Sequence, residues 1–165
     1  MRALIGLCML TSLAAAAETG ADPVLAGVLS NAPVSLEKGM AASAREGKPI
    51  SAKYELEVDG LQLSVYTMRD GKFSEVIVDH GTGAVSKIIP ITDGDDLTHA
   101  REQKDVMDHA KRSLEDAAAD AVRAHAGFRA VSAMPGRKDG RLVAEVMLTN
   151  GKEWMTVNEI IDGSE

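Results

Sequence analysis

Few side chains in this sequence have the types and spacing that chemistry requires. Glu55 and Glu57 lie two residues apart on an expected strand, which would let them pair as carboxylates, but a solvated strand face has the same spacing. The stretch 93–96 (Asp-Gly-Asp-Asp) resembles the start of a calcium loop, but it lacks the closing glutamate and is better explained as a linker and helix cap. The histidines form no pair four residues apart, as a helical zinc site requires: His80, His99, His109 and His125.

Nucleophilic catalysis has no better support. No serine stands in a G-x-S-x-G motif, and no glycine-rich phosphate loop is present. Ser35 and Ser113 each precede an apolar helical pattern, where a serine side chain caps the helix. We therefore predict no catalytic residue, no metal ligands and no cofactor, and we expect the chain not to be an enzyme.

Four residues are weak candidates for binding. Asp79, Thr82 and Gly83 belong to one expected turn, where an aspartate bonds its own backbone and a glycine takes positive φ. The only tryptophan, Trp154, is explained either as a half-buried anchor or as a hot spot for a partner. For all four, a structural role is the simpler interpretation.

The N-terminus has the pattern of a secretory signal peptide. A basic start at Arg2 is followed by an apolar run, and the alanines 14–17 provide an A-x-A cleavage site. We predict that residues 1–17 are removed after Ala17 and that the protein is periplasmic or secreted. The single cysteine, Cys8, lies within this segment, so the exported chain would contain no disulfide.

The composition indicates which partners are unsuitable. The chain has 25 acidic against 18 basic residues and only 3% aromatic residues, and it shows no basic stripe. Such a chain is not expected to bind nucleic acid or an anionic membrane surface, and no membrane span is predicted.

The sequence also repeats itself at a distance of about 80 residues. A Ser-Leu-Glu at 35–37 returns at 113–115, and the later matches are Asp59-Gly60 with Asp139-Gly140, Gly71-Lys72 with Gly151-Lys152, Asp79 with Glu159, and Gly83 with Gly163. Repetition of this kind indicates that one supersecondary unit is used twice.

The periodicity within the repeat predicts an α+β fold. A helix over 35–46 precedes alternating strands at 50–58, 61–68 and 73–78 and a short strand at 84–89. A short helix is expected at 24–30. One long helix, or two that meet near Arg112, leads to strands at 129–134, 141–148 and 154–160. We thus predict two repeated units, each a helix packed on a three- to four-stranded antiparallel sheet, joined by a long or broken central helix.

The two copies disagree in phase. Leu61, Leu63 and Val65 alternate in the first copy, whereas 80 residues later the apolar set is Leu142, Ala144 and Val146. A one-residue slip turns every side chain of a strand to the other face. Either a bulge interrupts the repeat or the two sheets bury different faces. The predicted boundaries are 18–92 for the first unit and 93–165 for the connector and the second, degenerate unit.

The stretch Glu75-Val76-Ile77-Val78-Asp79-His80-Gly81-Thr82-Gly83-Ala84-Val85 resembles a PepSY domain. Asp79, Thr82, Gly83 and Val85 match the family's pattern, over roughly residues 33–90 in the first copy and more weakly over 110–163 in the second. The resemblance implies a helix followed by antiparallel strands. It also implies kinship with pieces of the propeptides of secreted metallopeptidases, for which an inhibitory or folding role is proposed. The family motif contains no catalytic residue.

Two functions are therefore expected as alternatives. The first is an exported non-enzymatic binding or regulatory module with an unknown protein partner, with a peptidase as one candidate, for which the chain would be an inhibitor or modulator. The second is a periplasmic sensor of a small ligand or metal ion that uses the cleft between the two units.

Overall fold

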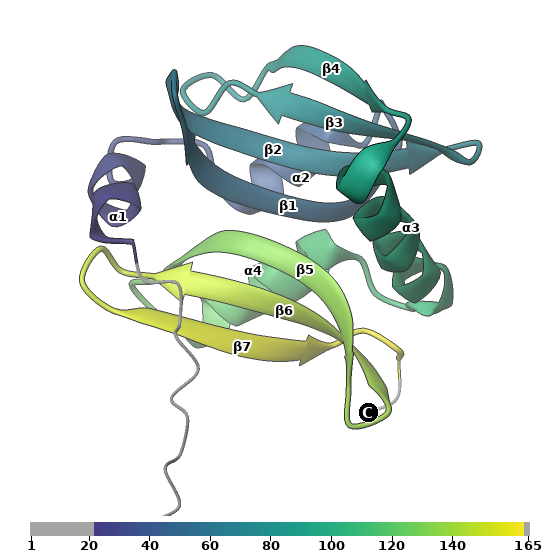
Figure 1. Cartoon of the computed structure of the whole chain (residues 1–165). Coiled ribbons are helices and arrows are strands. Elements are labelled where there is room, and N and C mark those ends of the chain that lie inside the picture. Colours follow the sequence, from purple (N-terminus) through teal and green to yellow (C-terminus); the bar gives the residue numbers. More distant parts are fainter. Residues whose placement is uncertain (1–21, 164–165) are drawn as a thin grey trace, which may run out of the picture.

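The computed structural model describes residues 22–163, which contain four helices and seven strands (Figure 1). The helices are α1 (Pro23–Leu29), α2 (Leu36–Ser43), α3 (Gly94–His109) and α4 (Leu114–Ala124). The predicted signal peptide, residues 1–17, lies outside the described residues. Within 22–163 no helix is long and apolar enough to cross a membrane.

Helices α1, α2 and α4 begin where the sequence predicts caps, whereas Asp93, which precedes α3, makes no side-chain hydrogen bond to the start of that helix. The carboxylate of Asp22 accepts hydrogen bonds from the backbone N–H groups of Val24 and Leu25, and Pro23 starts α1. The hydroxyl of Ser35 caps α2, and that of Ser113 caps α4 by accepting from the N–H of Asp116. The central helix is broken, as one of the two predicted alternatives had it, with extended backbone at Ala110. The predicted outline of two units and a central helix did not include the short helix expected at 24–30. The structure therefore has one helix more than that outline, namely α1.

The strands form one continuous antiparallel sheet. They are β1 (Lys48–Glu57), β2 (Gly60–Arg69), β3 (Lys72–Val78), β4 (Val85–Ile91), β5 (Arg129–Lys138), β6 (Arg141–Thr149) and β7 (Trp154–Ile160). Their order is β4-β3-β2-β1-β5-β6-β7, so the first meander meets the second where β1 pairs with β5. The α+β class is therefore correct, and the strands of both halves belong to a single sheet of seven.

The two halves of the sheet have the same hydrogen-bonding register at a spacing of 81 residues. Ala52 lies opposite Val65 in the first half, and Ala133 lies opposite Val146 in the second. Each first strand also carries a bulge at the same place, at Pro49–Ser51 and at Ala130–Ser132. A bulge disrupts a ladder locally, so its recurrence fixes the alignment of the two halves independently of sequence.

This spacing corrects the equivalence inferred from the turns. The Asp-Gly pairs at 59–60 and 139–140 are 80 residues apart, but the strands around them are related by 81. In the first half the two-residue loop is Val58-Asp59, whereas in the second it is Asp139-Gly140, with both residues at positive φ. The apparent change of phase follows from this shift of one residue, because Leu63 and Val65 correspond to the buried Ala144 and Val146. The predicted strand at 129–134 is likewise too short, since β5 continues to Lys138.

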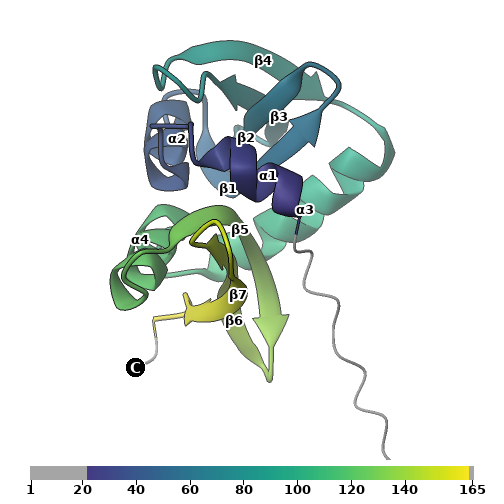
Figure 2. The same ribbon diagram turned by 90° about the vertical axis from the view of Figure 1, so that its left-hand side faces the viewer.

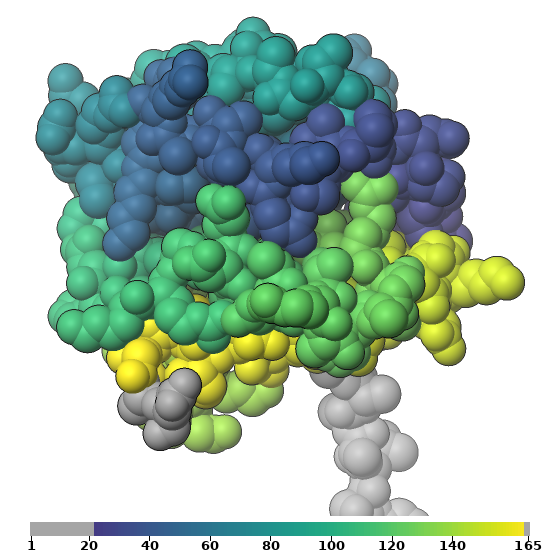
Figure 3. All heavy atoms as spheres, turned by 180° about the vertical axis from the view of Figure 1, so that it is seen from behind, coloured from purple at the N-terminus to yellow at the C-terminus, as the bar shows by residue number. Residues whose placement is uncertain are grey.

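The helices lie on both sides of the sheet. Figure 2 shows α2 and α4 on one side and α3 on the other. Seen from behind, α2 and α4 pack against each other and form a continuous layer (Figure 3). This helical face of the sheet holds most of the core, including Leu63, Val65 and Val146, each fully buried.

Two cations tie the halves together. Arg129, at the start of β5, donates through Nη1 to the carbonyls of Leu29 and Ala32 at the end of α1, and through Nη2 to that of Val34. Lys48 holds the corresponding position in β1 and donates to the carbonyl of Met107 near the end of α3, at 2.6 Å. Arg129 of the second half thus caps α1, which precedes the strands of the first half. Lys48 of the first half caps α3, which precedes the strands of the second half.

Candidate functional site

Asp79, Thr82 and Gly83 come together in the turn between β3 and β4, where they are hydrogen-bonded to one another. Oδ1 of Asp79 accepts hydrogen bonds from the backbone N–H groups of Gly81 and Thr82, at 3.0 and 2.7 Å, and from the hydroxyl of Thr82 at 2.9 Å. Gly83 has φ +79° and donates its N–H to the carbonyl of Asp79. These hydrogen bonds, first that from the Thr82 backbone, hold the pKa of the exposed Asp79 carboxyl below its usual value.

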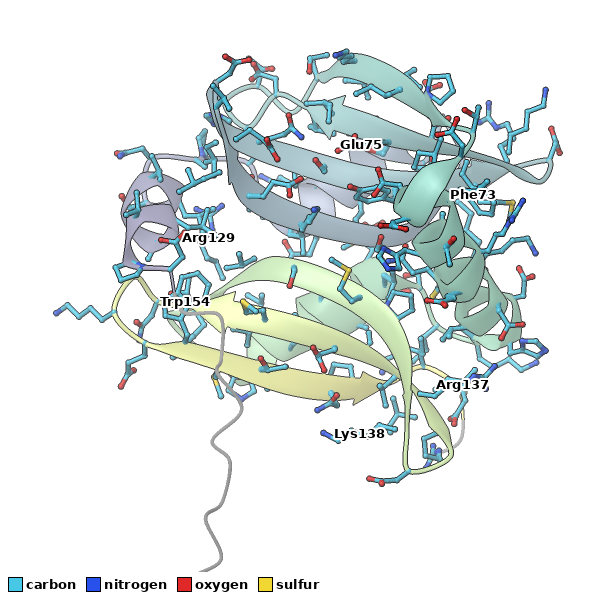
Figure 4. The ribbon with its side chains drawn as sticks, in the orientation of Figure 1. Phe73, Glu75, Arg129, Arg137, Lys138 and Trp154 are labelled. Atoms are coloured by element: carbon cyan, nitrogen blue, oxygen red, sulfur yellow. The ribbon has the colours of Figure 1, made fainter. Side chains whose placement is uncertain are left out.

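Trp154 lies in the other half of the molecule. It begins β7, is half-buried and packs against the core. Four strands separate β7 from β3, so Trp154 and the Asp79 turn do not form one site. Three of the four sequence candidates therefore share one turn, and the fourth, Trp154, labelled in Figure 4, lies apart from them.

The face of β1–β3 away from α2 is the candidate binding surface, and we call it the open face. Leu63 faces α2, because a Cβ on Gly39 would lie only 2.6 Å from the Cδ2 atom of Leu63. Its strand partner Tyr54 shares that face. Side chains alternate along a strand, so Lys53 and Glu55 point to the opposite side. That side is visible in Figure 4, where Glu75 is labelled.

A groove of about 470 Å³ runs across the open face and over the first turn of α3. It is acidic, and we call it the acidic groove. The carboxylates that line it are those of Glu55, Glu57, Asp59, Glu75 and Asp96. Among the described residues that line this groove, Lys53 is the only cation. Because Lys53 is already in an ion pair with Glu55, the groove has a strong excess of negative charge.

Tyr66 forms part of the floor of this groove. Its ring lies under the Lys53 ammonium, which is 5.8 Å from the ring centroid. Burial is the main cause that raises the pKa of the Tyr66 phenol, and the carboxylates of Glu75 and Glu55 raise it further. The phenol is therefore neutral at physiological pH, and its ring presents an electron-rich face to a cation.

A smaller hollow of about 140 Å³ adjoins the acidic groove beneath α3. It shares Lys53, Tyr66 and Asp96 with the groove and is closed by Met134 of β5. On its wall, the hydroxyl of the buried Ser51 donates to the side-chain oxygen of Gln103 at 2.7 Å. The hollow thus spans the junction between the first and second halves of the sheet.

Two of the four histidines and both serines have local structural partners. The ring Nδ1 atoms of His109 and His125 lie 2.8 Å from the carbonyls of Asp105 and Ala121, one helical turn earlier. In residues 22–163 no group of three or more histidine, cysteine, aspartate or glutamate side chains is placed to hold a metal ion. Ser35 and Ser113 cap helices, as predicted.

Comparisons with protein-family models, with curated proteins and with solved structures found no match to this chain.

Sequence reasoning found only part of this surface. Glu55 and Glu57 were visible as carboxylates on the wet face of a strand. Tyr66 and Glu75 lie opposite each other in the β2–β3 ladder, and Asp96 joins them from α3. The period-two pattern of 73–78 places Glu75 out of phase with the buried Val76 and Val78 but in phase with the buried Phe73, so the pattern alone does not mark Glu75 as a surface carboxylate. No local signal brings Asp96 to this face.

Proposed function

We propose that this protein is a non-enzymatic binding module that acts by contact with another protein through its open face. The observation that carries this proposal is the asymmetry of the first half of the sheet. Helix α2 covers one face with a fully packed core, whereas the other face carries a 470 Å³ groove lined with charged and aromatic side chains. A sheet face that serves only as a solvated surface has no need of a half-buried tyrosine among five carboxylates.

The proposal includes an origin in two PepSY-like units and export from the cytoplasm. The common register at a spacing of 81 residues and the matching bulges support a duplicated unit. The Asp79 turn supports the resemblance, because its hydrogen bonds give the motif residues Asp79, Thr82 and Gly83 a definite structural task. The signal-peptide pattern supports export. A secreted peptidase is the first partner to test, because the resemblance implies an inhibitory or modulating role.

Affinity capture from the protein's own envelope fraction tests this function. The bait is the exported chain, compared with Glu57→Gln/Glu75→Gln and with Glu102→Gln, which removes an exposed charge on α3 outside the acidic groove. A partner retained by the wild type and by Glu102→Gln but lost by the double variant supports the proposal. Recovery of no protein that depends on the open face, together with unchanged activity of secreted peptidases, would overturn it.

A second function, a small-ligand sensor, is favoured by the hollow beneath α3. The hollow lies where β1, β5 and α3 meet and has polar walls at Ser51 and Gln103. Its volume of about 140 Å³ suits a ligand of a few heavy atoms, far below the usual drug-sized site. At a ligand concentration 100-fold above the dissociation constant, the native state gains about 2.7 kcal/mol. Thermal melts with calcium, zinc, copper and small organic acids and amines would reveal this gain. A flat response to all of them would exclude the sensor.

A further inference from the structure

Several acidic side chains outside the open face have an arginine partner. In the second half and on the helices, Asp120 pairs with Arg112, Asp105 with Arg137 and Asp162 with Arg141. In the acidic groove the single cation, Lys53, pairs with Glu55. Among the ion pairs within residues 22–163, none involves Glu57, Asp59, Glu75 or Asp96. The groove therefore holds four carboxylates more than its internal cations neutralise.

The floor of the groove already shows how a cation is received there. The Lys53 ammonium lies over the Tyr66 ring and also pairs with Glu55, so an aromatic face and a carboxylate share one cation. Glu75 lies directly opposite Tyr66 in the β2–β3 ladder, on the far side from Lys53. A second cation placed between Tyr66 and Glu75 would have the same two kinds of partner.

The spacing of the carboxylates matches an extended chain. Glu55 and Glu57 are alternate residues of β1, so their Cα atoms are about 6.6 Å apart on one face. An extended peptide has the same repeat, and its alternate side chains point the same way. From Lys53 to Glu57 the strand covers about 13 Å, the length of four or five extended residues. A segment with basic residues at alternate positions would therefore match the repeat of Glu55 and Glu57 along β1, and a further basic side chain would have to reach across β2 to Glu75 on β3.

We propose that the open face binds a short, extended, basic segment of a partner protein, with lysine or arginine at alternate positions that contact Glu57, Glu75 and Tyr66. Charge complementarity selects this occupant, because the acidic groove presents an excess of negative charge together with an aromatic ring. The inference rests on the proposed function and specifies the chemistry of the partner.

A direct binding assay tests the chemistry of the occupant. The probe is a labelled five-residue peptide with lysine at positions one, three and five and threonine between, and its control has glutamine in place of lysine. Fluorescence anisotropy with the exported chain should show binding of the lysine peptide alone, weakened by added salt. Glu57→Gln/Glu75→Gln should raise the dissociation constant at least tenfold, and Glu102→Gln should leave it unchanged. Circular dichroism and unfolding of each variant confirm that the fold is kept.

The remaining outcomes overturn the inference in distinguishable ways. Equal binding of the two peptides, or of the lysine peptide to wild type and double variant, shows that basic charge does not select the occupant. If the peptide fails while envelope capture still yields a partner that depends on Glu57 and Glu75, the binding function stands and the basic segment is wrong. Self-association of the wild type in sedimentation, lost in the double variant, would make a second copy of the chain the occupant.

Discussion

The two halves of the sheet share a ladder but differ in how they use charge. Lys48 and Arg129 occupy the same place at the start of β1 and β5, and each caps the helix that precedes the strands of the other half. Arg129 reaches three carbonyls and lies over the Tyr54 ring, at 5.5 Å from its centroid, whereas Lys48 reaches one carbonyl. In the second half Asp120 and Asp162 pair with arginines, whereas in the groove of the first half Glu55 alone has an ion-pair partner, Lys53. The two halves therefore share the hydrogen-bonding register that supports the core, whereas the charged side chains on their surfaces differ.

The largest expected effect comes from breaking the stronger of the two helix caps. Arg129→Ala removes the donors of three carbonyls between α1 and α2, and we expect a loss of about 3 kcal/mol in the free energy of unfolding. Lys48→Ala removes one donor from a more exposed position and should cost about 1 kcal/mol. Urea unfolding of both variants measures the difference. Arg129→Lys should recover part of the loss, because an ammonium can reach at least one of the carbonyls. Equal costs for the two alanine variants would contradict the asymmetry.

The next effect tests the packing of α2 on the first half of the sheet. Gly39 lies against Leu63, where an added Cβ would meet the Cδ2 atom at 2.6 Å, and Leu63 is fully buried. Counted from the caps Ser35 and Ser113, the second half has Ala117 at the position of Gly39, and the ladder places Ala144 at that of Leu63. The first half thus combines glycine with leucine, and the second combines alanine with alanine.

Gly39→Ala should therefore destabilise the protein by about 1–2 kcal/mol, because overpacking exceeds the gain in helix propensity. The matched control is Gly27→Ala in α1, where no atom lies within 4 Å of the added Cβ. That variant should gain up to about 1 kcal/mol. Adding Leu63→Val to Gly39→Ala should recover part of the loss, which a thermodynamic cycle on urea unfolding will show. Stabilisation by Gly39→Ala alone would contradict the tight contact.

Local signals explain which parts of this structure were predictable. Ser35 and Ser113 mark the starts of α2 and α4 by residue type and position. The alternation of apolar and polar residues from Ile50 onward indicates β1 and β2 and the hairpin that they form. The joining of the halves depends on Ala52 opposite Ala133 and Lys53 opposite Ser132, a pairing that no nearby residue specifies. Only part of the acidic groove could be predicted, because local signals do not specify tertiary contacts. Glu55 and Glu57 share a strand, but Glu75 and Asp96 lie near them only in the folded structure.

A smaller effect, dependent on pH, is expected at the β3–β4 turn. The folded-state pKa of Asp79 lies below its unfolded value, so its charged form stabilises the native state. This contribution is fully present above the unfolded pKa of about 4 and is lost as the pH falls through the lower folded pKa. Asp79→Asn should therefore lower the melting temperature at pH 7, and the gap to the wild type should close in strongly acidic solution. A gap that stays constant from pH 7 to pH 2 would show that the carboxylate charge does not matter to the turn.

The smallest expected effect is a change in melting temperature that has opposite signs at the acidic groove and at the Asp105–Arg137 ion pair. Glu57 and Glu75 lie among other carboxylates, so Glu57→Gln/Glu75→Gln relieves repulsion and should raise the melting temperature slightly. Asp105→Asn breaks an exposed pair with Arg137 and should lower it slightly, since such pairs contribute about 0–1 kcal/mol. Both changes should shrink in 1 M salt, where charges are screened beyond about 3 Å. Thermal melts at low and high salt therefore decide whether the groove holds its negative charge at the expense of stability. If the double variant melts lower than the wild type at low salt, the carboxylates stabilise the fold, and their excess charge offers no reason to expect a basic partner.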